Sequence, residues 1–264
     1  MILIRTGGQG LFRRWKQLRG ENRGLTLYYI MLHAAVACMG IYEAFQGRWG
    51  HAGLCLLALA LFSLPSLAAD VLKLRVEAPL DIAVTLFVVC ADLCGEVLGF
   101  YLRFPWWDAA LHVIWGFLGG LLGCAFLEAL QGSRLRAPAA ALAALGFAAL
   151  SSILWEFFEF SMDALFHMDM QKDAWLQSVS SVLLNPEGRN IAVTAVPETV
   201  TVDGALWPGL LDIGLLDTIG DLFLGFLGSL GAALALLPAR RPKLLRGLMP
   251  VPLTHKEGKS DETE

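Results

Sequence analysis

Six long apolar runs alternate with short polar segments along the chain. The runs cover residues 25–45, 52–71, 80–101, 106–130, 137–160 and 210–239. About 20 consecutive apolar residues in a helix cross the ~30 Å hydrocarbon core of a bilayer. This pattern predicts an all-α fold class, a polytopic membrane protein whose six transmembrane helices form one domain at residues 25–239.

Lysine and arginine residues are concentrated in alternate connections, and this distribution predicts the orientation of the helices. Residues 1–24 and residues 240–264 carry six basic residues each, and the internal turns at 73–75 and 134–136 carry two each. Connections rich in positive charge stay on the cytoplasmic side of a membrane. We therefore predict a cytoplasmic basic arm at 1–24, a cytoplasmic tail at 240–264, and both termini inside.

One long connection, at residues 168–209, would then lie on the extracytoplasmic side of the membrane. The segment Asn185 to Gly188 has turn composition, and Ile191 to Val202 has partly alternating β-branched residues. A hairpin or an amphipathic cover fits this pattern. A lid over a site and a plain extracytoplasmic loop are both open interpretations of the segment.

The composition agrees with a membrane location and excludes a nucleic-acid partner. Of 264 residues, 56% are hydrophobic and 17% are charged, and the mean hydropathy is +0.59, which is too apolar for a soluble domain. The net charge is −4, whereas a protein that binds nucleic acid usually has an excess of basic residues. Membrane lipids are the partner that this composition predicts.

Acidic residues inside the apolar runs gather toward one predicted end of the helices. Each acid costs roughly 2.5–3.5 kcal/mol at the centre of a bilayer by insertion scales, so intramembrane acids are candidates for function. With the predicted orientation, four helices bring such residues to the outer half of the membrane. The pairs with helical spacing are Asp92/Glu96, Asp108/His112, Glu156/Glu159, Glu159/Asp163 and Asp217/Asp221.

Few basic residues are available to neutralise these acids. Near the outer ends of the runs the sequence offers Arg48 and Arg103, so protons or a bound cation must supply the rest. Several carboxylates with one imidazole suit Mg²⁺, Mn²⁺ or Zn²⁺. We predict a divalent-metal site made from Asp108, His112, Glu156, Glu159, Asp217 and Asp221.

Simpler roles remain open for several of these residues. His112 could equally be a hydrogen-bonded interior histidine. Asp92 and Glu96 fit a solvated or helix-capping role, and Asp163 could lie in the water of the headgroup layer.

Three segments, at residues 107–112, 155–163 and 214–222, together resemble the YjdF-like family of bacterial membrane-spanning proteins and, more distantly, the VanZ-like proteins. They read WDAALH, WEFFEFSMD and GLLDTIGDL, and the resemblance extends over about residues 92–231. It implies a multi-pass protein of the bacterial cytoplasmic (inner) membrane. It supports the choice of the six residues above and supplies no established reaction.

Three functions compete at this point. The first is metal-assisted hydrolysis or transfer on a lipid or cell-envelope headgroup, with Glu156 or Glu159 as general base. Arg103 would then hold an anionic group of the substrate, although anchoring to lipid phosphate is the simpler role. The second is a proton- or ion-coupled permease. The third is a non-catalytic envelope or assembly protein whose acids only pair with other groups.

Overall fold

The computed structural model shows a mostly helical chain. It describes residues 23–63, 67, 74–75, 78–167, 169–238, 245, 247–249 and 251–252. The helices are α2 (Arg23–Phe45), α3 (Trp49–Leu61), α5 (Ala78–Val88), a π-helix (Val89–Val97), α6 (Phe100–Arg103), α7 (Trp107–Gln131), α8 (Ala137–Phe166) and α9 (Leu215–Leu236). Residues 1–22 of the predicted basic arm lie outside the described residues, and so does most of the predicted tail.

Four of these helices are long and apolar enough to cross a membrane, within the residues described. They are residues 24–45 of α2, together with α7, α8 and α9. They correspond to the first, fourth, fifth and sixth apolar runs. The second run overlaps the 13-residue α3, which begins three residues before it, and the third is divided mainly between α5 and the π-helix that follows it directly. The described helices therefore agree with a multi-pass membrane protein. The number of six spans and the orientation of the helices in the membrane stay predictions.

The helix predicted from residue 210 begins later. Leu210–Asp212 form strand β7, Gly214 has a φ of +84°, and α9 starts at Leu215. The backbone N–H of Leu216 donates to Oδ2 of Asp212 at 2.6 Å, which satisfies one of the free N–H groups at the helix start. The prediction was wrong here because apolar composition alone does not mark a positive-φ glycine as a break.

The chain divides into two compact units. One comprises residues 1–149 and 224–264, and the other comprises residues 150–223. Both boundaries fall inside uninterrupted helices, α8 and α9. The first unit has two buried clusters: one around Leu121, Cys124 and Ala232, and one around Val36, Cys55 and Phe62.

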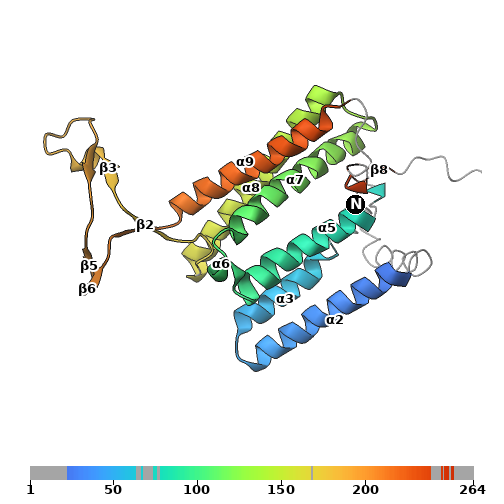
Figure 1. Cartoon of the computed structure of the whole chain (residues 1–264), viewed down its shortest axis with the longest axis horizontal. Helices are drawn as coiled ribbons and strands as arrows, with labels where there is room; N and C mark the ends of the chain where they lie inside the picture. Colours follow the sequence, from blue (N-terminus) through green and yellow to red (C-terminus); the bar gives the residue numbers. More distant parts are fainter. Residues whose placement is uncertain are drawn as a thin grey trace, which may run out of the picture. The chain divides into compact units, whose positions relative to one another are not determined.

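Small residues keep helices of the first unit close together. A Cβ on Gly120 would lie 2.9 Å from the Cβ of Ala232, and a Cβ on Gly40 would lie 3.0 Å from that of Cys55. Helices in membranes pack through such small residues because lipid gives no hydrophobic drive for their association. In Figure 1, α7 and α9 run side by side.

Short strands lie between the two helical parts of the second unit. Their antiparallel pairs are β2 (Ala174–Leu176) with β7, β3 (Val179–Ser181) with β4 (Val193–Ala195), and β5 (Val200–Val202) with β6 (Ala205–Trp207). The turn between β5 and β6 is Asp203-Gly204, both at positive φ, as a tight hairpin requires. A further pair joins β1 (Leu74–Arg75) to β8 (Val251–Pro252) in the first unit.

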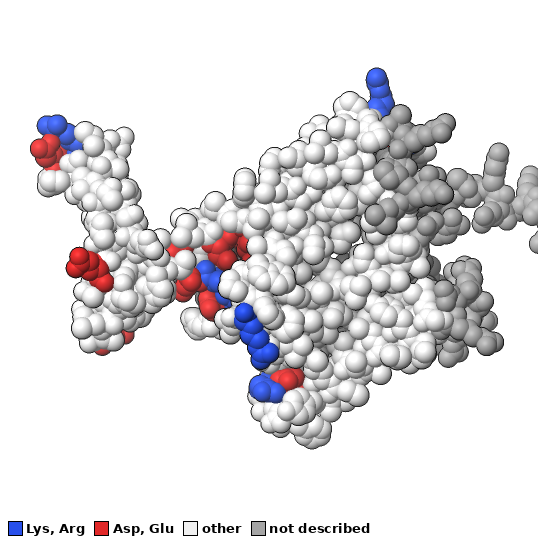
Figure 2. Space-filling model, in the orientation of Figure 1, with Lys and Arg blue, Asp and Glu red and all other residues white. Residues whose placement is uncertain are grey.

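The two strands inside the segment 191–202 thus pair with strands outside it. On the face drawn in Figure 2, charged side chains gather toward the ends of the helices and the stretches between are uncharged, as surfaces in contact with lipid require.

Candidate metal centre

The first two candidate ligands stand one turn apart near the start of α7. Nε2 of His112 lies 3.5 Å from Oδ1 of Asp108, and His112 is buried. The start of α7 is held by Trp107, whose Nε1 donates to the carbonyl oxygen of Cys90 in the π-helix at 3.1 Å. The Trp107 ring also packs edge-on against Phe100, with ring centroids 4.9 Å apart. These contacts fix the helix turn that carries the two ligands.

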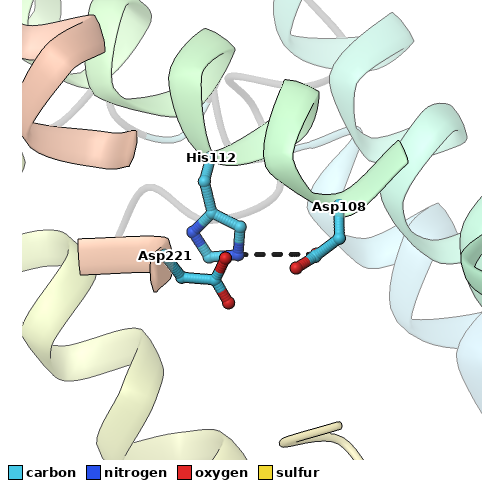
Figure 3. Close-up of side chains that lie close together, drawn as sticks. All are labelled: Asp108, His112 and Asp221. Atoms are coloured by element: carbon cyan, nitrogen blue, oxygen red, sulfur yellow. Dashed lines mark ion pairs between the residues drawn. The ribbon is translucent and has the colours of Figure 1, made fainter. Parts of the chain in front are cut away.

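Asp221 of α9 completes a group of three. Each of Asp108, His112 and Asp221 offers one ligand atom, and these atoms all lie within 4.8 Å of one another. Asp221 is 4% exposed. Figure 3 shows the imidazole of His112 between the two carboxylates, with its ion pair to Asp108 drawn as a dashed line. The i,i+4 spacing placed the first pair on one helix face, and the structure brings to it Asp221, another of the six residues named from the sequence.

The spacing of His112 and Asp108 matches that of two ligands of a small divalent cation. Ligand atoms at 2.0–2.1 Å from a tetrahedral ion lie ~3.4 Å apart, close to the observed distance between His112 and Asp108. Three protein ligands leave a coordination position for water or substrate, as in catalytic zinc sites. An imidazole among the donors suits Zn²⁺ better than Mg²⁺, which prefers oxygen ligands and retains water.

Asp217, one turn before Asp221, makes a different contact. Its Oδ2 accepts a hydrogen bond from the backbone N–H of Lys172 at 2.8 Å. Asp163 does the same for two neighbouring residues, since its carboxylate accepts from the N–H of Met170 at 2.7 Å and of Gln171 at 2.9 Å. The structure therefore uses Asp217 and Asp163 to hold the segment that leaves α8.

The predicted glutamates share a buried face of α8. Glu156 is 5% exposed and Glu159 is 8% exposed, and Ser152, four residues before Glu156, is also buried. Nε1 of Trp155 donates to Oε1 of Glu159 at 2.9 Å. Sequence reasoning missed Ser152, although its spacing of four residues from Glu156 was a usable signal.

The remaining predicted residues have separate surroundings. Arg103 is exposed at the end of α6. Asp92 and Glu96 lie half-buried in the π-helix. Arg48 pairs with Glu43 through its Nε and through Nη2 at 2.9 Å, and Nδ1 of His51 lies 3.2 Å from the same carboxylate. This carboxylate raises the pKa of the Arg48 guanidinium above its ordinary value.

Several acids lie close together where the long connection begins. Desolvation raises the pKa of the Asp173 carboxyl above its ordinary value, and the negative charges of Asp169, Asp212 and Asp163 raise it further. These carboxylates therefore repel one another. Asp163 and Asp212 in the same region also accept backbone hydrogen bonds.

The family model described as predicted membrane protein, DUF2238, matches residues 24–242, which include all the candidate ligands. No curated protein and no solved structure matches the chain.

Proposed function

We propose, from the premise that this chain belongs to the DUF2238 family of predicted membrane proteins, that it is a multi-pass membrane protein that binds a divalent cation through Asp108, His112 and Asp221. The observation that carries the proposal is the approach of three ligand atoms to within 4.8 Å of one another. Two buried members, one an acid, lie in helices that are apolar along most of their length, where burial of charge is costly. A cation compensates the two carboxylates.

The chemistry follows from the open position that three ligands leave. A bound divalent cation polarises a phosphoryl or carbonyl oxygen and lowers the pKa of a coordinated water. We propose metal-assisted hydrolysis or transfer on a lipid or cell-envelope headgroup as the reaction. Glu156 or Glu159 would accept the proton of the attacking water, and Arg103 would hold an anionic part of the substrate.

The wider ligand set and the topology belong to the same proposal. Asp217, Glu156 and Glu159 are the further proposed ligands. Six spans with both termini cytoplasmic, in the inner membrane of a bacterium and with the site toward the outer face, agree with the distribution of Lys and Arg. The YjdF-like proteins would then be members of the same family.

The orientation can be tested with single cysteines in intact cells. We expect a membrane-impermeant thiol reagent to label Glu187→Cys, in the long connection, and to leave Ser133→Cys, in the turn between α7 and α8, unlabelled. Labelling of both positions, or the reverse pattern, would contradict the proposed topology.

Metal content of the purified full chain tests the function. We expect the wild-type protein in detergent to hold a Zn²⁺ or Mn²⁺ ion, and His112→Ala and Asp221→Asn to lose it. Asp163→Asn and His33→Ala are controls, since these residues lie outside the ligand group. Asp217→Asn decides whether the ligand set is wider than three. Equal metal content in wild-type and His112→Ala protein would overturn the proposal.

Turnover separates an enzyme from a cation-binding protein. We expect Glu156→Gln to lose headgroup release from added membrane lipid extract, measured by mass spectrometry, and its metal content to decide whether Glu156 is a ligand as well as the general base. A second candidate function, a non-catalytic assembly protein, is favoured by Asp163 and Asp217, which hold the backbone of residues 170–172. Metal binding without any lipid or envelope product would support that second function.

A further inference from the structure

The helices α7 and α9 touch through glycines that lie one turn beyond the candidate ligands. Gly116 follows His112 by four residues, and Gly225 follows Asp221 by four, so each glycine shares a helix face with a ligand. A Cβ on Gly116 would overlap the carbonyl oxygen of Gly225 and lie 3.0 Å from its Cα. The two backbones are therefore in direct contact at this point.

A second glycine of α9 makes the same kind of contact. A Cβ on Gly228 would overlap the carbonyl oxygen of Val113, the residue after His112, and lie 2.9 Å from the backbone nitrogen of Phe117. We call Gly116, Gly225 and Gly228 the glycine crossing. All three residues and Val113 belong to the first compact unit, and α9 runs without a break from Asp221 into the crossing.

We propose that Gly116 and Gly228 are positioning residues of the metal centre, an inference that rests on the proposed metal site. They set the separation of the two helix axes, and thereby the distance between His112 and Asp221 one turn earlier. A methyl group at either glycine would raise the interaxial distance on the order of 1 Å. Metal–ligand distances tolerate only about 0.2 Å, so His112 and Asp221 would no longer reach one ion together.

Titration of the metal-free protein with Co²⁺ tests this inference, because the visible d–d bands report both affinity and coordination number. We expect Gly116→Ala and Gly228→Ala to weaken Co²⁺ binding about 10–100-fold and to change the bands, as loss of support around a ligand does. Gly231→Ala is the matched control on α9, since its Cβ would meet only Cδ2 of Phe117 at an ordinary 3.6 Å. It should bind Co²⁺ as the wild type does.

A compensating substitution separates positioning from loss of structure. In Gly116→Ala protein, Asp221→Glu adds one methylene to the ligand and should restore part of the lost affinity and the wild-type spectrum. A purely structural role for Gly116 would give no such rescue. Wild-type Co²⁺ affinity in a folded Gly116→Ala variant, or absence of rescue, would overturn the inference.

Two further outcomes are distinguishable. If the wild-type protein binds no Co²⁺, the proposed function fails together with the inference. If neither glycine variant folds, Asp221→Glu alone is decisive, because it leaves the glycine crossing intact. With the helices held close, the longer side chain should overreach and weaken Co²⁺ binding about tenfold, whereas unchanged affinity would show that the crossing does not set the ligand spacing.

Discussion

Replacing Asp163 by alanine removes two hydrogen-bond acceptors from the segment that follows α8. The backbone N–H groups of Met170 and Gln171 donate to the two carboxylate oxygens at 2.7 and 2.9 Å. A hydrogen bond to a charged group contributes about 1.5–3 kcal/mol. Asp163 is half-buried, so we take the lower value for each bond, or about 3 kcal/mol together. This loss corresponds to an opening equilibrium on the order of 10²-fold larger.

Hydrogen exchange of the Met170 and Gln171 amides measures this opening. We expect about 100-fold faster exchange in Asp163→Ala and an intermediate increase in Asp163→Asn, which keeps one acceptor oxygen. Asp173→Ala should leave both amides unchanged. Metal content should stay at the wild-type level in all three variants. Exchange within twofold of the wild type in Asp163→Ala would refute the argument that this acid holds the connection.

Three further outcomes follow from described contacts. Gly123→Ala should lose about 1–3 kcal/mol of stability by overpacking, because its Cβ would overlap a phenylalanine of α8; thermal unfolding in detergent measures this, with Gly146→Ala, which faces open space, as control. Trp155→Phe should lower the unfolding temperature, because it removes the 2.9 Å hydrogen bond that Nε1 of Trp155 donates to the buried Glu159. The raised pKa of Asp173 means that its folded form favours the proton, so its contribution is present below the unfolded pKa and lost as pH rises through the folded pKa. Asp173→Asn should therefore be more stable than wild type near neutral pH, and the difference in thermal midpoint should vanish toward acid pH.

Hydropathy and helical spacing predicted α7 well. Apolar runs of sufficient length became the four long helices, and the spacing of Asp108 and His112 put both on one face. The sequence could not separate Asp217 from Asp221, because their spacing is equally regular. In the structure the two aspartates differ because the backbone N–H of Lys172, distant along the chain, donates a hydrogen bond to Asp217.

Local backbone geometry was the other feature that the sequence did not predict. The predicted helix began at residue 210, five residues before the true start of α9. Hydropathy does not distinguish Leu210–Asp212, which pair with β2, from the helix that follows. In the third run, composition gave no sign of a π-helix. Its wider bonding is visible only in contacts such as the N–H of Leu98 to the carbonyl of Leu93, at 2.8 Å.

That π-helix behaves as an α-helix with surplus chain length. Deleting one residue between 89 and 97 would let i,i+4 bonding continue from α5 and would redirect the carbonyl groups of the widened turns. The carbonyl of Cys90 would then no longer meet the indole of Trp107, the residue immediately before Asp108. The number of residues in one helix therefore decides where the first ligand on the next helix stands.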